Sequence, residues 1–208
     1  TRVFGSSSTD IGRAVASDST GNVYVTGDTL GTSFDGETAD GSLNGFLTKF
    51  DSGGTRQWTR VIGAADDERA YAAATDGDNN VYVVGEAIGD LDGENNAGSW
   101  DAFLIKFNSN GTRVWTRLLG STGIDTAYGV TVDNDGNVNV TGATDGVLGI
   151  DPSPGDPSVN YDAFVAKYAP SGGLLWVRQA RSQAGWGTSI GVDDAGNSYV
   201  FGYFGPTI

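Results

Sequence analysis

The feature that most constrains this sequence is an internal repeat. Residues 46–63 read FLTKFDSGGTRQWTRVIG and residues 103–120 read FLIKFNSNGTRVWTRLLG, so that 12 of these 18 positions are identical. A looser third copy, FVAKYAPSGGLLWVRQAR, begins at Phe164. Self-similarity at a fixed period predicts a repeat architecture in which each unit stacks on the next.

A second block recurs four times, as DSTGNVYVTG, DGDNNVYVVG, DNDGNVNVTG and DDAGNSYVFG, starting at Asp18, Asp76, Asp133 and Asp193. Alternating β-branched and aromatic residues between turn residues are typical of β-strands. Each complete repeat holds four such strand signals. Glycine occupies one turn position in three copies, and Asn79 replaces it in the fourth. Asparagine tolerates a positive φ best after glycine, so we expect left-handed backbone there.

The predicted fold is all-β, a β-propeller of four-stranded antiparallel blades. Val23 and Val25 lie on one face of a strand and Tyr24 on the other, so a lone sheet would leave one apolar face in water. Stacked blades cover both faces. We expect a single domain over residues 1–208, with blades at about 11–63, 68–120 and 125–181, a partial blade at 184–203, and an N-terminal outer strand at 1–5.

Three arrangements of these units remain open. The chain is a fragment of a larger ring, or two chains share one ring, or one chain closes as a four-bladed ring. In each of them Trp58, Trp115 and Trp176 recur at one repeat position, which favours packing between blades. We expect the arginines of the outer strands to discourage pairing at that edge. We expect the repeated lysines either to pair with Asp101 and Asp162 or to cover apolar surface with their stems.

The pieces AxxxDxxGNVYVTG, DAFLxKF and GTxxWTRxxG resemble the bacterial β-propeller repeat family known as SBBP repeats, over essentially the whole chain. The block at the first turn is more weakly similar to the NHL-type propeller pattern. The resemblance implies a propeller in an exported or cell-surface bacterial protein. It implies no catalytic residues.

Composition excludes several classes of site. The chain has no cysteine and no histidine, which excludes disulfides, zinc ribbons, imidazole bases and Ser-His-Asp triads. A net charge of −14 repels nucleic-acid phosphates. No apolar run reaches the roughly 18 residues of a membrane helix, so we expect no membrane insertion. The expected partners are other protein chains, through hetero- or self-association, or a glycan.

The acidic turns are candidate calcium loops. Asp133 and Asp135 are spaced like the start of such a loop, and so are Asp76 and Asp78. Calcium takes six to eight oxygens, usually including a later carboxylate, and that carboxylate is missing here. A plain hairpin turn is the alternative. Calcium is the one cofactor that the sequence suggests.

Other residues are candidate ligand contacts. Trp100 and Trp186 fall outside the repeated tryptophan position, in or beside connections. Asp10, Glu68 and Asp125 each precede a turn aspartate by eight residues, near one mouth of the propeller. They would hold a cation or cationic ligand, or pair for hydrolase or lyase chemistry, unless they are solvated loop charges. The long connection at 145–161 is a further candidate.

The sequence supports three functions. The first is a non-catalytic structural or interaction module of an exported or cell-surface bacterial protein. The alternative is a glycan- or small-ligand-binding propeller, and the second alternative is a carboxylate-based hydrolase or lyase. Whether the chain is an enzyme stays open, with the regular repeat and the absence of histidine and cysteine arguing against it.

Overall fold

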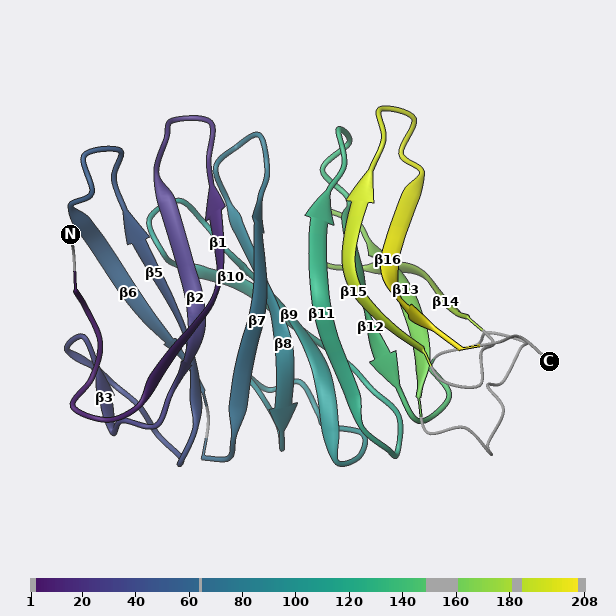
Figure 1. Ribbon diagram of the computed structural model, residues 1–208, viewed down its shortest axis with the longest axis horizontal. Coiled ribbons are helices and arrows are strands. Elements are labelled where there is room, and N and C mark those ends of the chain that lie inside the picture. The colour runs from purple at the N-terminus through teal and green to yellow at the C-terminus, as the bar shows by residue number, and fades with distance from the viewer. Residues whose placement is uncertain (1–2, 64, 149–160, 181–184, 206–208) are drawn as a thin grey trace.

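A computed structural model describes residues 3–63, 65–148, 161–180 and 185–205 of the 208-residue chain. The regular structure in this part is β-strand throughout. No helix there is long and apolar enough to cross a membrane. The sheets stand side by side in one row, with the strands β5 and β6 toward one end of it and β15 and β16 toward the other (Figure 1).

Three sheets contain four antiparallel strands each. The first consists of β1 (Asp10–Ser17), β2 (Val23–Thr29), β5 (Asn44–Phe50) and β6 (Arg56–Ile62). The second consists of β7 (Glu68–Thr75), β8 (Val81–Ile88), β9 (Trp100–Phe107) and β10 (Arg113–Leu119). The third consists of β11 (Asp125–Val132), β12 (Val138–Thr144), β13 (Asp162–Tyr168) and β14 (Leu174–Gln179). Within each sheet the strands pair in chain order.

A fourth sheet holds two strands, β15 (Gly185–Val192) and β16 (Ser198–Phe204). A small hairpin, β3 (Ser33–Phe34) and β4 (Glu37–Thr38), lies in the connection between β2 and β5. We call β1, β7, β11 and β15 the inner strands, because each contacts the next from sheet to sheet. The strands β6, β10 and β14 at the other edge are the outer strands.

The core lies between the sheets. One apolar cluster joins the first and second sheets through residues such as Tyr24, Leu47 and Phe103. Another joins the second and third sheets through residues such as Tyr82 and Phe164. This confirms the all-β propeller fold, in which neighbouring blades cover each other's apolar faces. The open row differs from the four-bladed closed ring that was one of the three expected arrangements.

The N-terminal outer strand expected at residues 1–5 is not found where the structure describes it. Val3, Phe4 and Gly5 lie in irregular chain. The Phe4 ring instead packs against Phe34 and Phe50, with centroids 5.9 and 5.2 Å apart. A β-strand needs a neighbouring strand as its hydrogen-bonding partner, and the described residues place none beside this segment. The packing of the Phe4 ring therefore holds the segment in place. Residues 1–2, and 149–160 of the long connection, lie outside the described residues.

An aspartate organises the turn between the first two strands of every sheet. The Asp18 carboxylate accepts hydrogen bonds from the backbone N–H groups of Thr20 and Asn22, both at 3.0 Å, and from the Tyr24 hydroxyl at 3.0 Å. Asp76 and Asp193 accept the same set from their own turns. The spacing D-x-x-G-N-x-Y is therefore a closed hydrogen-bonded unit. Asn79 has a φ of 62°, which confirms the expected left-handed backbone.

The third sheet closes this unit differently. Asn139 stands where the tyrosine would be, and the Lys167 Nζ lies 2.8 Å from the Asp133 carboxylate. In the second sheet Lys106 lies 3.6 Å from Asp76. The expectation that these lysines pair with Asp101 and Asp162 was wrong. Both lysines point along the sheet face toward the turn aspartate, where they add a positive charge to an already hydrogen-bonded carboxylate.

The outer strand of one sheet holds a turn of the next sheet. The Trp58 Nε1–H donates to the Ser109 carbonyl at 3.3 Å, and the Arg60 Nε–H donates to the Gly111 carbonyl at 2.8 Å. Gly111 has a φ of +79°, and a Cβ built there would lie 2.8 Å from the Trp58 ring. Only glycine therefore fits under the indole. We call this tryptophan–arginine pair a turn clamp.

The clamp recurs between the second and third sheets with nearly the same geometry. Trp115 donates to the Pro170 carbonyl at 3.3 Å and Arg117 to the Gly172 carbonyl at 2.8 Å. The expectation that the repeated tryptophans pack between blades is confirmed for Trp58 and Trp115. The outer-strand arginines were expected to protect a free edge, but Arg60 and Arg117 instead bind the neighbouring sheet.

We predict that Trp115→Ala lowers the free energy of unfolding by about 3–5 kcal/mol, because the ring packs on both Tyr82 and the glycine turn. Trp176 has the same position in the third sheet, but no following turn lies against it among the described residues. Trp176→Ala is the matched control and should cost clearly less. Urea denaturation measures both. Equal losses would mean that the clamp adds nothing to the packing of the indole within its own sheet.

We also predict a loss of stability in acid. Burial raises the pKa of Asp18, but the hydrogen bonds from Asn22, Thr20 and Tyr24 outweigh it and lower the pKa to about 2. A carboxylate with a lowered pKa contributes stability above its unfolded pKa of about 3.9, which is lost as pH falls toward 2. Urea midpoints at pH 7 and at about pH 3 should show a steeper fall for the native protein than for Asp18→Asn. Asp40→Asn, at an exposed position, should leave the fall unchanged.

Candidate interaction surface on the inner strands

A β-bulge recurs at one position in all four inner strands. The pairing with the second strand shifts between Gly12 and Ala14 in the first sheet, which leaves Arg13 without an opposite residue. The same shift leaves an extra residue in each of the other inner strands, namely Tyr71, Tyr128 and Thr188. A bulge re-aims the side chain of its extra residue. Each inner strand therefore presents one bulge side chain at the same position along its length, which we call the same height.

Three of these side chains form a continuous row across three sheets. The Arg13 guanidinium lies 4.9 Å from the centre of the Tyr71 ring, which is a cation–π contact. The Tyr71 and Tyr128 rings are tilted, with centroids 5.3 Å apart. Both tyrosines are half-buried and Arg13 is exposed. Thr188 follows on the fourth sheet, where its hydroxyl donates to the Phe201 carbonyl at 3.2 Å.

Buried carboxylates hold this row in place. Both carboxylate oxygens of Asp28 accept hydrogen bonds from Arg13. Glu86 accepts from Arg69 at 2.7 Å and from the Tyr71 hydroxyl at 2.8 Å on one oxygen. Its other oxygen accepts from Thr126 of the third sheet at 2.6 Å. Each carboxylate is thus neutralised by an arginine, as buried charges require.

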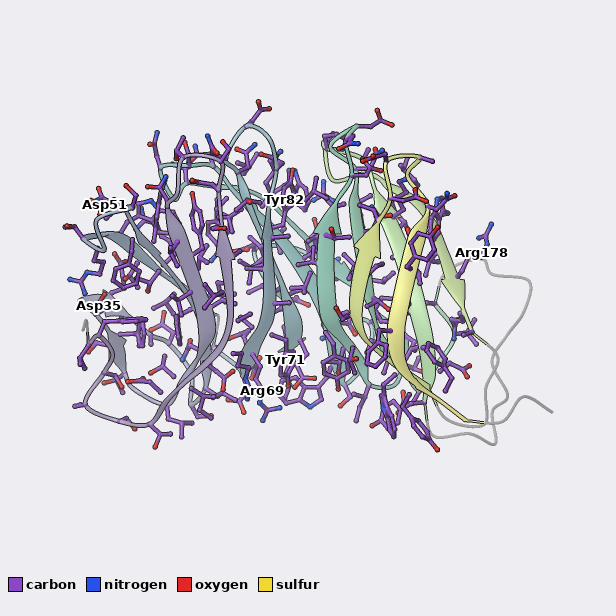
Figure 2. All side chains as sticks on the ribbon, turned by 45° about the horizontal axis from the view of Figure 1, so that its top comes forward. Asp35, Asp51, Arg69, Tyr71, Tyr82 and Arg178 are labelled. Carbon is purple, nitrogen blue, oxygen red and sulfur yellow. The ribbon has the colours of Figure 1, made fainter. Side chains whose placement is uncertain are left out.

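The protonation states along the row are fixed at neutral pH. Burial raises the pKa of Tyr71, and the nearby Glu86 charge and hydrogen bond raise it further. The hydrogen bond that Arg13 donates to the Asp28 carboxylate raises the pKa of Arg13. Figure 2 shows Arg69 and Tyr71 close together at the foot of the inner strands. The row therefore offers a hydroxyl, an arginine and aromatic faces, and no group poised to exchange protons.

The two tryptophans predicted as ligand contacts lie at the same end of the sheets. The Arg69 guanidinium lies 4.7 Å from the Trp100 ring centre. Trp186 lies between Tyr161 and Tyr203, with centroid distances of 6.2 and 5.4 Å. Both indoles are half-buried. Trp100 thus joins the row through Arg69, whereas Trp186 belongs to a separate aromatic cluster at the fourth sheet.

Two of the carboxylates predicted near a propeller mouth, Asp10 and Asp125, are hydrogen-bonded to the loops at the start of their inner strands. Asp10 accepts from the Ser6 N–H at 2.7 Å and from Thr29 at 2.6 Å. Asp125 accepts from the Ser121 N–H at 2.6 Å, and burial raises its pKa. Glu68 and Asp125 are 0% exposed. A fully buried carboxyl group cannot reach a substrate, so these positions give no support to carboxylate catalysis.

The four aspartates predicted for calcium line one groove. Asp76, Asp78, Asp133 and Asp135 surround a space of about 460 Å³ between the turns of the second and third sheets. Asp76 and Asp133 already accept hydrogen bonds from their own turns. Within the ranges that the structure describes, no three acidic side chains are arranged to hold a metal ion. Calcium binding stays a prediction.

The sequence analysis missed two aspartates that bind the outer strand of their own sheet. Asp35 and Asp92 each begin an Asp-Gly turn with positive φ at both residues. Asp35 accepts a hydrogen bond from Thr59 at 2.7 Å, and Asp92 accepts one from Thr116 of its own outer strand. Both also pair with arginines of those strands. The signal was present as Asp-Gly-Glu in two copies, a strong hairpin indicator.

The comparison with protein families decides what kind of repeat this is. The family model described as the SBBP β-propeller repeat matches residues 1–35 and 114–149. These two segments of the chain are similar to the SBBP β-propeller repeat. The matched SBBP regions include the inner-strand bulges at Arg13 and Tyr128 and the clamp residues Trp115 and Arg117.

Two curated proteins are similar to this chain. An uncharacterised WD repeat-containing protein of Acanthamoeba polyphaga mimivirus is 26% identical over 184 residues, which cover 71% of this chain and 13% of that protein. The regulatory protein FlaEY of Caulobacter vibrioides is 28% identical over 189 residues, which cover 80% of this chain and 20% of that protein. The chain thus spans a small part of the length of the relatives it matches.

A solved structure is similar in fold to this chain. The crystal structure of a protein of unknown function from Bacteroides caccae superimposes with a TM-score of 0.51 at 15% identity. It matches 92% of this chain and 53% of its own. At that identity the likeness extends to the fold alone.

We predict that Glu86→Ala lowers the free energy of unfolding by about 2–3 kcal/mol, because it leaves Arg69, Tyr71 and Thr126 without their acceptor. Glu37→Ala is the matched control, since Glu37 is exposed and lies 3.7 Å from Arg60. It should change stability by less than about 0.5 kcal/mol. Thermal and urea unfolding check both values, and a near-neutral Glu86→Ala would contradict the structural role of the network.

Proposed function

We propose that this chain is a non-catalytic structural and interaction module of an exported or cell-surface bacterial protein. It would bind another protein through the inner strands. The observation that carries the proposal is the row of Arg13, Tyr71 and Tyr128, which three separate sheets bring together at one height. Arginine, tyrosine and tryptophan are the residue types that contribute most to binding energy at protein interfaces.

The same surface suits binding better than catalysis. Its charges are paired as Arg13–Asp28 and Arg69–Glu86, so a partner meets a rigid, nearly neutral surface with little ordering cost. Conversely, the candidate catalytic carboxylates Glu68 and Asp125 are closed to solvent. A relative named as a regulatory protein and another named as WD repeat-containing support an interaction role. The exported or cell-surface address rests on the family resemblance.

Glycan binding is the second candidate, and one observation favours it. Tyr161, Trp186 and Tyr203 form an aromatic cluster, and Tyr203 is 55% exposed. Aromatic faces of this kind offer apolar area beside a polar edge. The cluster lies at the fourth sheet, apart from the row of Arg13, Tyr71 and Tyr128, so variants can separate the two activities.

The test compares partner retention by the native protein and by the Tyr71→Ala/Tyr128→Ala double variant, immobilised and exposed to bacterial envelope extract. We expect at least a roughly tenfold loss for the double variant, because truncating two interface aromatics removes several kcal/mol. Val114→Ala, on the exposed face of an outer strand, is the control and should retain the partner fully.

Equal retention by the double variant would contradict binding at the inner strands. A glycan array run with the native protein and with Trp186→Ala tests the second candidate, which requires a signal that the variant loses. Cell fractionation of the native bacterium checks the proposed address, and a strictly cytoplasmic protein would contradict it.

A further inference from the structure

Two buried aspartates lie side by side at the contact between the second and third sheets. Trp100 of β9 forms a parallel bridge with Ile124, so the next residues of these two segments, Asp101 and Asp125, are neighbours. Asp101 is 1% exposed and Asp125 is 0% exposed. Among the ion pairs of the described residues, none includes either of these carboxyl groups. The two aspartates therefore lack the arginine that neutralises the buried carboxylates of Asp28 and Glu86.

The charged groups on the surrounding elements do not neutralise the two aspartates either. Asp145 follows β12, and its negative charge acts on Asp125. The Asp90 carboxylate accepts a hydrogen bond from a backbone N–H of the connection before β9. The other charges on β7 to β10 and their connections form ion pairs of their own, namely Arg69–Glu86, Lys106–Asp76, Arg113–Asp92 and Arg117–Glu94.

The two carboxyl groups are hydrogen-bonded unequally. The Asp125 Oδ2 accepts from the Ser121 N–H at 2.6 Å and from the Ser121 hydroxyl at 2.9 Å, and Thr144 also hydrogen-bonds to this carboxyl group. The Asp101 Oδ2 accepts from the Ala97 N–H at 2.8 Å, and its buried Oδ1 has no hydrogen-bond partner among the described residues. Hydrogen bonds to a carboxylate favour its charged form. The surroundings therefore favour a charge on Asp125 and a proton on Asp101.

Electrostatics favours the same distribution of charge. Burial raises the pKa of Asp101, and the negative charge of Asp125 raises it further. Burial also raises the pKa of Asp125, although the hydrogen bonds from Thr144 and Ser121 oppose this rise. Two neighbouring buried carboxylates without a counter-ion cannot both stay charged at an acceptable cost, and one of them keeps a proton.

The other two sheet contacts do not repeat this pair. The backbone N–H groups of Glu68 and Gly185 donate to the carbonyl groups of the residues just before β5 and β13, at 2.9 and 2.8 Å, so the backbone contact is the same at all three places. At the first contact Asn44 takes the position of Asp101, beside Glu68. At the third contact Asp162 is beside Gly185. Of the three contacts, the middle one alone joins two carboxyl groups.

We infer that Asp101 and Asp125 form a proton-binding site, which makes the contact between the second and third sheets sensitive to pH. One proton stays on the Asp101 Oδ1 at neutral pH and donates a hydrogen bond to the Asp125 carboxylate. When the pH rises and this proton is lost, two negative charges are buried side by side and the contact weakens. The inference is independent of the function proposed for the inner strands.

The site is connected to the support of the inner-strand row. The residue after Asp125 is Thr126, whose hydroxyl donates to Glu86 of the second sheet at 2.6 Å. Glu86 also accepts the hydrogen bond of the Tyr71 hydroxyl. A weaker contact at Asp125 would therefore also change how Tyr71 and Tyr128 lie relative to each other.

Infrared spectroscopy of the 208-residue chain detects the proton directly. We expect the carbonyl band of one protonated carboxylic acid at pH 7, and we expect Asp101→Asn to remove it. The variant should fold, because it copies Asn44 at the same position of the first sheet. Asp40→Asn changes an exposed aspartate and is the control, which should keep the band.

Urea denaturation between about pH 5 and pH 9 measures the effect of the proton on stability. A carboxyl group whose pKa is raised by folding contributes stability below its unfolded pKa of about 3.9, and this contribution is lost as pH rises through the folded pKa. Relative to Asp101→Asn, the folding equilibrium constant of the native protein should fall by up to about tenfold per pH unit until the folded pKa is passed. The sign is opposite to the acid loss expected for Asp18.

Asn44→Asp is the reverse variant. It places a carboxyl group beside Glu68 and so builds a second acid pair at the first contact. We expect a second protonated-acid band at pH 7 and a steeper fall of stability with rising pH than in the native protein.

Four outcomes would overturn the inference. The first is the absence of the acid band from the native protein, and the second is a band that survives Asp101→Asn. The third is an equal pH dependence of stability in the native protein and Asp101→Asn. The fourth is a urea midpoint that calcium raises and a chelator lowers in the native protein but not in Asp101→Asn, because a metal ion would then occupy the pair in place of the proton.

Discussion

The structure depends on the contact between an outer strand and a glycine turn of the next sheet. Each sheet has apolar residues on both faces, so it needs a neighbour on each side. The Trp58 and Trp115 rings provide the apolar area, and Arg60 and Arg117 satisfy turn carbonyls that would otherwise meet these rings unpaired. Because the clamp combines burial with directional hydrogen bonds, it fixes both the distance and the angle between sheets. The inner strands then align, which brings Arg13, Tyr71 and Tyr128 to one height.

Much of the fold could be predicted from the sequence because the same pattern of residues recurs in several copies. The repeated blocks predicted four-stranded antiparallel sheets, the turn positions and the left-handed backbone of Asn79. The tryptophan spacing predicted packing between blades. The aspartate at the start of each turn accepts a hydrogen bond from the backbone N–H two residues later. It also accepts a hydrogen bond from the tyrosine six residues later, which is present in three of the four copies.

The interaction surface on the inner strands was harder to predict from the sequence, for physical reasons. A β-bulge depends on pairing between two strands, and neither strand alone shows that Arg13 and Tyr71 fall on it. The regular charge of Arg60 and Arg117 was interpreted as edge protection, since the carbonyl groups they bind belong to another repeat and leave no local signal. Asp10 and Asp125 share a spacing, but their hydrogen bonding follows from the loop before each inner strand, where the Ser6 and Ser121 N–H groups donate to them.

The clamp also gives the stack a direction. The two pairs that hold a turn, Trp58–Arg60 and Trp115–Arg117, both act on the sheet that follows them in the chain. The two sides of this contact differ, since one side gives an indole face and N–H donors and the other gives turn carbonyl groups. Sheets joined in this way follow one another head-to-tail, because unlike surfaces of this kind do not pair across a twofold axis.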